Sequence, residues 1–95
     1  MIVWHVTSYK KFQKYLNDGI IKPPVRAWAD IREAERFSKQ TGRQIILRLK
    51  FPDNIVKKLP GHKGNAVYID EPYPIVTWFR GNIKITSQGI EGIEE

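Results

Sequence analysis

The chain has no cysteine, which excludes disulfide bridges and thiolate metal sites. Its longest apolar runs are about five residues, far short of the roughly 20 that span a bilayer, so no membrane segment is expected. No basic stretch followed by an apolar one opens the chain, which argues against a signal peptide and favours a cytoplasmic protein. The two histidines lie 57 positions apart and offer no metal-ligand spacing, and no glycine-rich phosphate-binding motif occurs.

Acidic residues are scarce, at ten against sixteen lysines and arginines, so the net charge is +6. Three of the ten acids fall in residues 91–95, which leaves residues 1–90 with sixteen bases, seven acids and a charge of +9. A domain this basic favours an anionic partner, either a nucleic acid or a phosphate-bearing cofactor. A lysine-rich surface that only maintains solubility explains the charge equally well.

Ninety-five residues with 41% hydrophobic composition indicate one folded domain over 1–95, with a loosely ordered acidic tail over 87–95. The class expected is α+β, with two N-terminal helices packed on a mixed or antiparallel sheet. The expected elements are a strand over 2–7, a helix ending at Gly19, a connection over 20–25, a helix from Asp30 to Gly42, a strand over 43–51, a turn from Asp53, a loop over 61–65, a strand over 66–69, and a hairpin of 75–80 and 83–86.

Local patterns support the two clearest elements. Asp30 precedes Glu33 by three residues, which is the spacing of a capping box at the start of a helix. Residues 43–51 alternate, with the apolar side chains of Ile45, Leu47, Leu49 and Phe51 on one face and Gln44, Ile46, Arg48 and Lys50 on the other. The second face therefore carries a basic stripe.

His5 is the first candidate functional residue. It lies inside an apolar strand and shares one face of that strand with Val3 and Thr7. A histidine in this place is either structural, with a neighbour satisfying its hydrogen bonds, or a neutral imidazole that contacts a ligand hydroxyl.

Two short motifs carry a family resemblance. The first is Trp4-His5-Val6-Thr7-Ser8, followed by a helix that ends at Gly19, and the second is Arg26-Ala27-Trp28-Ala29-Asp30, which opens a helix containing Ala34 and Phe37. Over residues 3–51, about half of the chain, this arrangement resembles the compact ADP-ribosyltransferase superfamily. Its histidine branch includes the RNA 2′-phosphotransferases and several small bacterial toxins. The resemblance implies an ADP-ribosyltransferase-like fold.

The resemblance also implies that NAD, or a ligand bearing ADP-ribose, is bound. His5 would bind the adenosine-side ribose hydroxyl, with Thr7 or Ser8 assisting. Trp28, or Phe37 nearby, would provide an aromatic surface for the nicotinamide.

The resemblance implies a catalytic acid as well. Glu71, or Asp70 beside it, would stabilise the oxocarbenium-like transition state while ADP-ribose passes to a protein or nucleic-acid acceptor. The chain would then be an active transferase or a degenerate relative, and a toxin of this kind implies an antitoxin-like protein partner.

Two other functions compete with the transferase. The first is a non-catalytic nucleic-acid-binding module in which aromatic side chains stack on bases and basic side chains grip phosphates. Its candidate residues are Arg26, Arg43, Arg48, Lys50, Trp78 and Arg80. The second is a metal-independent ribonuclease that uses His5 and His62 as acid and base.

Overall fold

The computed structural model describes residues 1–61, 64–74 and 83–85, and the last three are described by their backbone alone. The elements are β1 (Ile2–Thr7), α1 (Tyr9–Asp18), β2 (Ile20–Ile21), β3 (Val25–Trp28), α2 (Ile31–Thr41), β4 (Ile45–Lys50), a 3₁₀ turn (Asp53–Ile55), β5 (Lys57–Lys58), β6 (Ala66–Ile69), β7 (Tyr73–Pro74) and β8 (Ile83–Ile85). The expected α+β class, with two helices and a sheet, is confirmed. Within the described residues, no helix is long and apolar enough to cross a bilayer.

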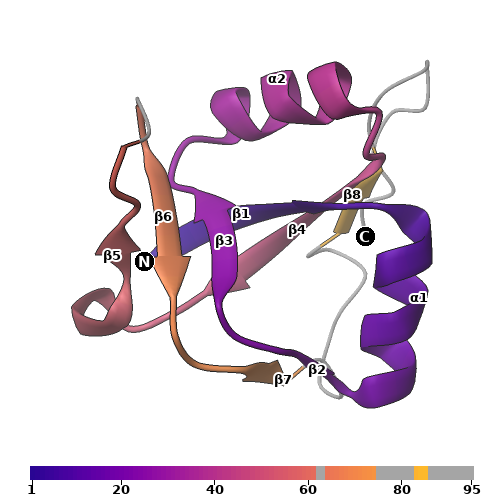
Figure 1. Ribbon diagram of the computed structural model, residues 1–95, viewed down its shortest axis with the longest axis horizontal. Coiled ribbons are helices and arrows are strands. Elements are labelled where there is room, and N and C mark those ends of the chain that lie inside the picture. The colour runs from indigo at the N-terminus through magenta and orange to yellow at the C-terminus, as the bar shows by residue number, and fades with distance from the viewer. Residues whose placement is uncertain (62–63, 75–82, 86–95) are drawn as a thin grey trace.

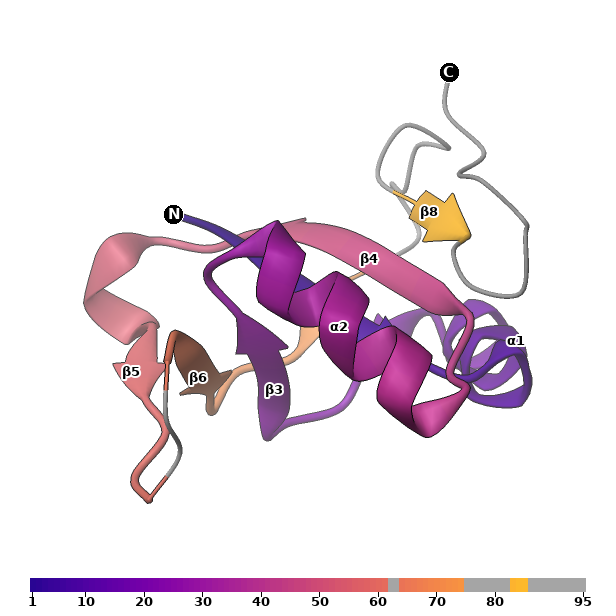
Figure 2. The same cartoon turned by 90° about the horizontal axis from the view of Figure 1, so that it is seen from above.

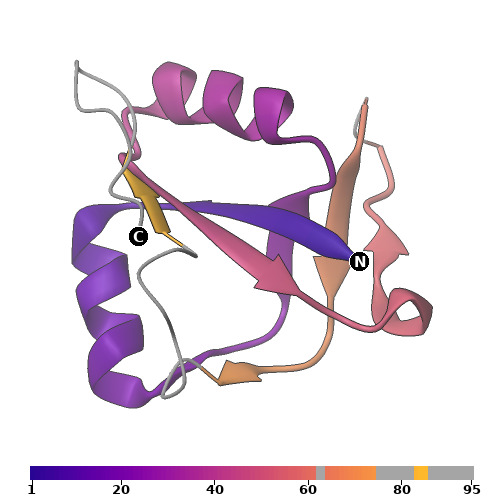
Figure 3. The ribbon, with the colours of Figure 1, turned by 180° about the vertical axis from the view of Figure 1, so that it is seen from behind.

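Six strands form the main sheet in the order β5-β6-β3-β1-β4-β8, and β2 pairs with β7 in a separate small sheet (Figure 1). Every pairing among the described strands is antiparallel. β1 lies in the middle, hydrogen-bonded to β4 along its whole length and to β3 on its other side. Seen from behind, β8 adjoins the beginning of β4 (Figure 3).

The two helices cover opposite faces of this sheet. α2 lies across β1 and β4 (Figure 2), whereas α1 packs against the other face with the β2–β7 pair. The α1 face holds the larger apolar cluster, whose buried members are Val3, Phe12, Ile21, Val25, Ala27, Ile45, Leu47, Leu49, Phe51, Val67 and Ile69. The α2 face holds a smaller cluster of Val6, Ala34 and Ile46, against which Trp4, Trp28 and Phe37 pack while remaining partly exposed.

Both helices begin and end where the sequence predicts. Ser8 caps α1, because its Oγ accepts a hydrogen bond from the Lys11 amide at 3.1 Å, and Asp30 caps α2 through the Arg32 amide at 2.8 Å. Gly19 and Gly42 end the helices with φ of 75° and 73°, the left-handed conformation that glycine adopts without a steric penalty. The caps fix where β1 passes into α1 and β3 into α2.

Three local predictions are corrected. Residues 20–25 are not merely a connection, because they include β2 and the start of β3. Arg26 to Trp28, where no strand is predicted, form the rest of β3. Glu33 does not close a capping box: its carboxylate accepts from the Asn65 amide instead. The predicted strand over 75–80, the turn after it and the tail over 87–95 lie outside the described residues.

Candidate functional site

His5 and Thr7 lie on the α1 face of the sheet. β1 alternates so that Val3, His5 and Thr7 point to this face while Trp4 and Val6 point to α2. The β1–β4 register places Leu47 opposite His5 and Ile45 opposite Thr7, and both of these partners are fully buried. His5 is therefore a polar side chain set among core residues.

Two hydrogen bonds hold the His5 ring. Its Nδ1 lies 2.6 Å from the backbone carbonyl of Arg26, and its Nε2 lies 3.1 Å from the hydroxyl of Tyr15 on α1. Because a carbonyl can only accept, Nδ1 must carry the proton and donate it. Nε2 of the neutral ring is then an acceptor, and the Tyr15 hydroxyl donates to it. We assign the Nδ1–H tautomer on this basis.

The surroundings keep this ring uncharged. Burial lowers the pKa of His5 below the ordinary histidine value, and the positive charges of Lys11 and Arg43 lower it further. The hydrogen bond to the Arg26 carbonyl favours the charged form and acts in the opposite direction, but burial has the larger effect. A neutral imidazole of fixed tautomer presents one acceptor nitrogen, which suits a hydroxyl donor.

The neighbouring hydroxyls of Thr7 and Ser8 differ in their hydrogen bonding. Thr7 is 2% exposed, and its Oγ1 has no hydrogen-bond partner among the described residues. A buried hydroxyl without a partner costs free energy, so it is a natural contact for a polar ligand atom. Ser8 is already engaged, because its Oγ caps α1. Thr7 is thus better placed than Ser8 to assist His5.

Trp28 and Phe37 lie together but away from His5. Their ring centroids are 5.7 Å apart, and the Arg43 guanidinium lies 5.5 Å from the Phe37 centroid. Trp28 pairs with Trp4 across β3 and β1, so both point to the α2 face. The sheet therefore separates this aromatic pair from the His5 ring. On the face of His5, the neighbouring aromatic ring is Tyr15, at 5.8 Å between centroids.

The two acidic candidates lie in an exposed bend between β6 and β7. Asp70 and Glu71 are both exposed, and neither belongs to a strand. β7 pairs with β2, which directly follows α1, so the bend leads towards the helix that carries Tyr15. No contact joins either carboxylate to His5 among the described residues.

Four basic candidates are exposed: Arg26 on β3, Arg43 before β4, and Arg48 and Lys50 on β4. Trp4 lies opposite both Trp28 and Arg48, and Ile2 lies opposite Lys50. Since directly paired residues share a face, the sheet brings Arg48 and Lys50 to the side of Trp28. Trp78, Arg80 and His62 lie outside the described residues.

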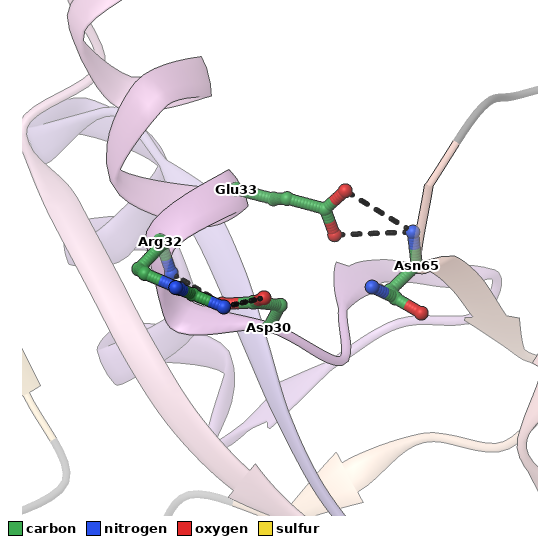
Figure 4. Close-up of polar contacts among 4 residues, drawn as sticks. All are labelled: Asp30, Arg32, Glu33 and Asn65. Atoms are coloured by element: carbon green, nitrogen blue, oxygen red, sulfur yellow. Dashed lines mark hydrogen bonds and ion pairs between the residues drawn. The ribbon is translucent and has the colours of Figure 1, made fainter.

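Two relevant residues are not evident from the sequence pattern. Tyr15 follows Phe12 by three residues, a spacing typical of an apolar helix stripe, yet its hydroxyl contacts His5. Glu33 reaches from the first turn of α2 to the Asn65 amide, at 3.0 and 3.3 Å from its two carboxylate oxygens, while Asp30 pairs with Arg32 at 3.1 Å (Figure 4). The Tyr15–His5 and Glu33–Asn65 contacts each join residues from different parts of the chain, so spacing along the sequence does not reveal them.

Comparison with known proteins assigns no family to the chain. No family model, no curated protein and no solved structure matches it. Within residues 1–61, 64–74 and 83–85, no group of three histidine, aspartate or glutamate side chains is placed to hold a metal ion.

Proposed function

We propose that this protein has an ADP-ribosyltransferase-like fold, binds NAD and transfers ADP-ribose to a protein or nucleic-acid acceptor. The observation that carries the proposal is the His5 imidazole, neutral and held in one tautomer by the Arg26 carbonyl. Its Nε2 points towards α1 as a hydrogen-bond acceptor. A ribose hydroxyl is a donor of the kind that this nitrogen accepts.

Binding would exchange one hydroxyl for another. In the free protein, the Tyr15 hydroxyl donates to Nε2 of His5. A ribose hydroxyl of NAD would take its place, and the exchange conserves the number of hydrogen bonds to the ring. The Thr7 hydroxyl, which has no partner among the described residues, would gain one from the same sugar.

The aromatic contact differs from the one that the sequence predicts. The nicotinamide contact predicted at Trp28 or Phe37 would lie on the face of the sheet opposite to the His5 ring. Tyr15 is the aromatic side chain beside His5, so in this proposal its ring lines the ligand.

The chemical step would break the glycosidic C–N bond of NAD, and nicotinamide would leave with the electron pair of that bond. The anomeric carbon, positively charged in the transition state, would bond to an acceptor nucleophile, which releases its proton. Glu71 is an exposed carboxylate on the bend before β7, and a negative charge there would stabilise the developing positive charge.

An NMR titration of ¹⁵N-labelled protein with NAD tests this proposal. We expect millimolar NAD to shift the ring signals of His5 and the amide signals of Thr7 and Tyr15, and ADP-ribose to reproduce the shifts. His5→Gln should abolish them, whereas Tyr15→Phe should preserve or strengthen them because the competing hydroxyl is gone.

Nicotinamide release measures turnover, and Glu71→Gln should reduce it while leaving the NAD shifts in place. Lys14→Gln, an exposed change on α1, is the matched control and should alter neither readout. Unmoved His5 and Thr7 signals at millimolar NAD would refute the proposal.

A further inference from the structure

The α2 face of the sheet carries a second surface, in which basic side chains lie around two adjacent tryptophans. We call it the tryptophan face and define it by Trp4, Trp28, Arg26, Arg48 and Lys50. The pairing Arg48–Trp4–Trp28 runs straight across β4, β1 and β3. Neighbouring strands are about 4.8 Å apart, so these three side chains are adjacent.

The remaining two members extend this row in both directions along the strands. Arg26 precedes Trp28 by two residues on β3 and is exposed on the same face. Lys50 follows Arg48 by two residues on β4 and pairs with Ile2. The three basic side chains thus lie around a pair of tryptophans, in the arrangement that nucleic-acid-binding surfaces use to contact phosphates and bases together.

The charged residues that the strands place on this face are all basic. None of the residues that the register places there on β1, β3, β4, β5 and β6 is acidic. Of the α2 carboxylates, Asp30 pairs with Arg32 and Glu33 accepts from the Asn65 amide (Figure 4), and Glu35 has an interaction of its own within the protein, as Arg48 does. An anionic partner would therefore meet no like charge from these strands.

The indoles are positioned for stacking. Trp4 and Trp28 pack against the cluster of Val6, Ala34 and Ile46 and remain partly exposed. Packing against this cluster fixes the rings before a ligand arrives, which lowers the entropic cost of binding. Stacked bases add a favourable contact that an acidic peptide or a phosphate-bearing lipid headgroup does not provide.

We propose that the tryptophan face binds single-stranded nucleic acid, with bases against Trp4 and Trp28 and phosphates against Arg26, Arg48 and Lys50. The inference does not depend on NAD binding, because the His5 ring is on the other face of the sheet.

Fluorescence anisotropy with labelled 12-nucleotide oligo(U) and oligo(dT) over a salt series tests the proposal. The double variant Arg48→Gln/Lys50→Gln should bind about 10- to 30-fold more weakly at 0.1 M salt and lower the slope of log K against log salt by about 1.4, since each phosphate contact on a single strand contributes about 0.7. Lys10→Gln/Lys14→Gln, which removes the same charge from the exposed side of α1, is the matched control and should change binding less than threefold.

Indole NMR signals provide the second readout, assigned with Trp4→Phe and Trp28→Phe. We expect oligo(U) to shift both signals in the wild-type protein. Equal weakening by the two double variants, unmoved indoles, or identical indole shifts with heparin or phosphatidylserine vesicles would each overturn the proposal. NAD-induced shifts at His5 should survive Arg48→Gln/Lys50→Gln, so failure of this proposal is separable from failure of the transferase proposal.

Discussion

On the α1 face of the central sheet, the polar side chains of β1 are few and set among buried apolar residues, whereas on the α2 face basic side chains lie beside two tryptophans and reach solvent. His5 belongs to the first face, and both of its ring nitrogens are engaged by Arg26 and Tyr15. Arg48 belongs to the second face, and it is exposed beside the partly exposed Trp4. The two faces of one sheet thus differ, with a hydrogen-bonded imidazole among core residues on one and exposed basic side chains on the other.

The largest expected difference between the two faces is in the free energy of unfolding that is lost when neighbouring residues of β4 are replaced. Leu47 is fully buried in the α1-side cluster, so Leu47→Ala should lower the free energy of unfolding by about 2–5 kcal/mol through lost burial and a cavity. Arg48 is exposed on the opposite face, and Arg48→Ala should lower the free energy of unfolding by about 1 kcal/mol or less, because an interaction of an exposed charged side chain contributes little. Urea denaturation followed by circular dichroism measures both. Similar losses in the two variants would contradict the assignment of faces.

A smaller effect on the free energy of unfolding is expected at Gly64, which lies beside Glu33 in the first turn of α2. Gly64 has φ of +78°, and a β-carbon there would collide with the Glu33 carboxylate. Gly61 has a similar φ of +77° but has open space around it, so Gly61→Ala should cost about 1–2 kcal/mol from conformation alone. Gly64→Ala should cost more. In a Glu33→Ala background the two costs should become equal, and a persistent excess at Gly64 would show that Glu33 is not the cause.

The smallest effect concerns the protonation of His5. Its pKa is lowered in the folded protein by burial, so below the unfolded value of about 6.5 the unfolded chain binds more protons than the folded one. The free energy of unfolding should therefore rise with pH from the lowered pKa up to about 6.5 and fall as the solution is acidified through that range. His5→Gln should flatten this part of the profile, measured by urea denaturation between about pH 5 and 8, where most carboxylates stay ionised. An unchanged slope would contradict a buried neutral His5.

Interactions within one segment of the chain can be predicted from the sequence. Ser8, Gly19, Asp30 and Gly42 mark the helix ends because capping is a local interaction. The alternation over 43–51 correctly places the apolar residues of β4 in the core. Ile46 is buried as well, because α2 covers the face that it shares with Arg48.

The pairing and register of strands from different segments cannot be predicted in the same way. β3 is four residues long, and its pairing with β1 and β6 defines it more than its own composition does. Alternation along a strand indicates which residues of β1 share a face with His5 and which residues of β3 share a face with Trp28. Whether His5 and Trp28 share a face depends on the β1–β3 register, which no local pattern reports. No pattern within one segment therefore indicates that the ribose contact predicted at His5 and the nicotinamide contact predicted at Trp28 lie on opposite faces of the sheet.

Arg26 takes part in both faces at once, through different atoms. Its carbonyl oxygen accepts a hydrogen bond from Nδ1–H of His5, whose ring is on the α1 side, while the exposed Arg26 side chain is on the tryptophan face. Any side chain at this position keeps that carbonyl, and the chain contains no cysteine. Arg26→Cys would therefore create a unique attachment point for a fluorophore or spin label, and a single labelled protein could report on the occupancy of the outer surface while the buried imidazole keeps its partner.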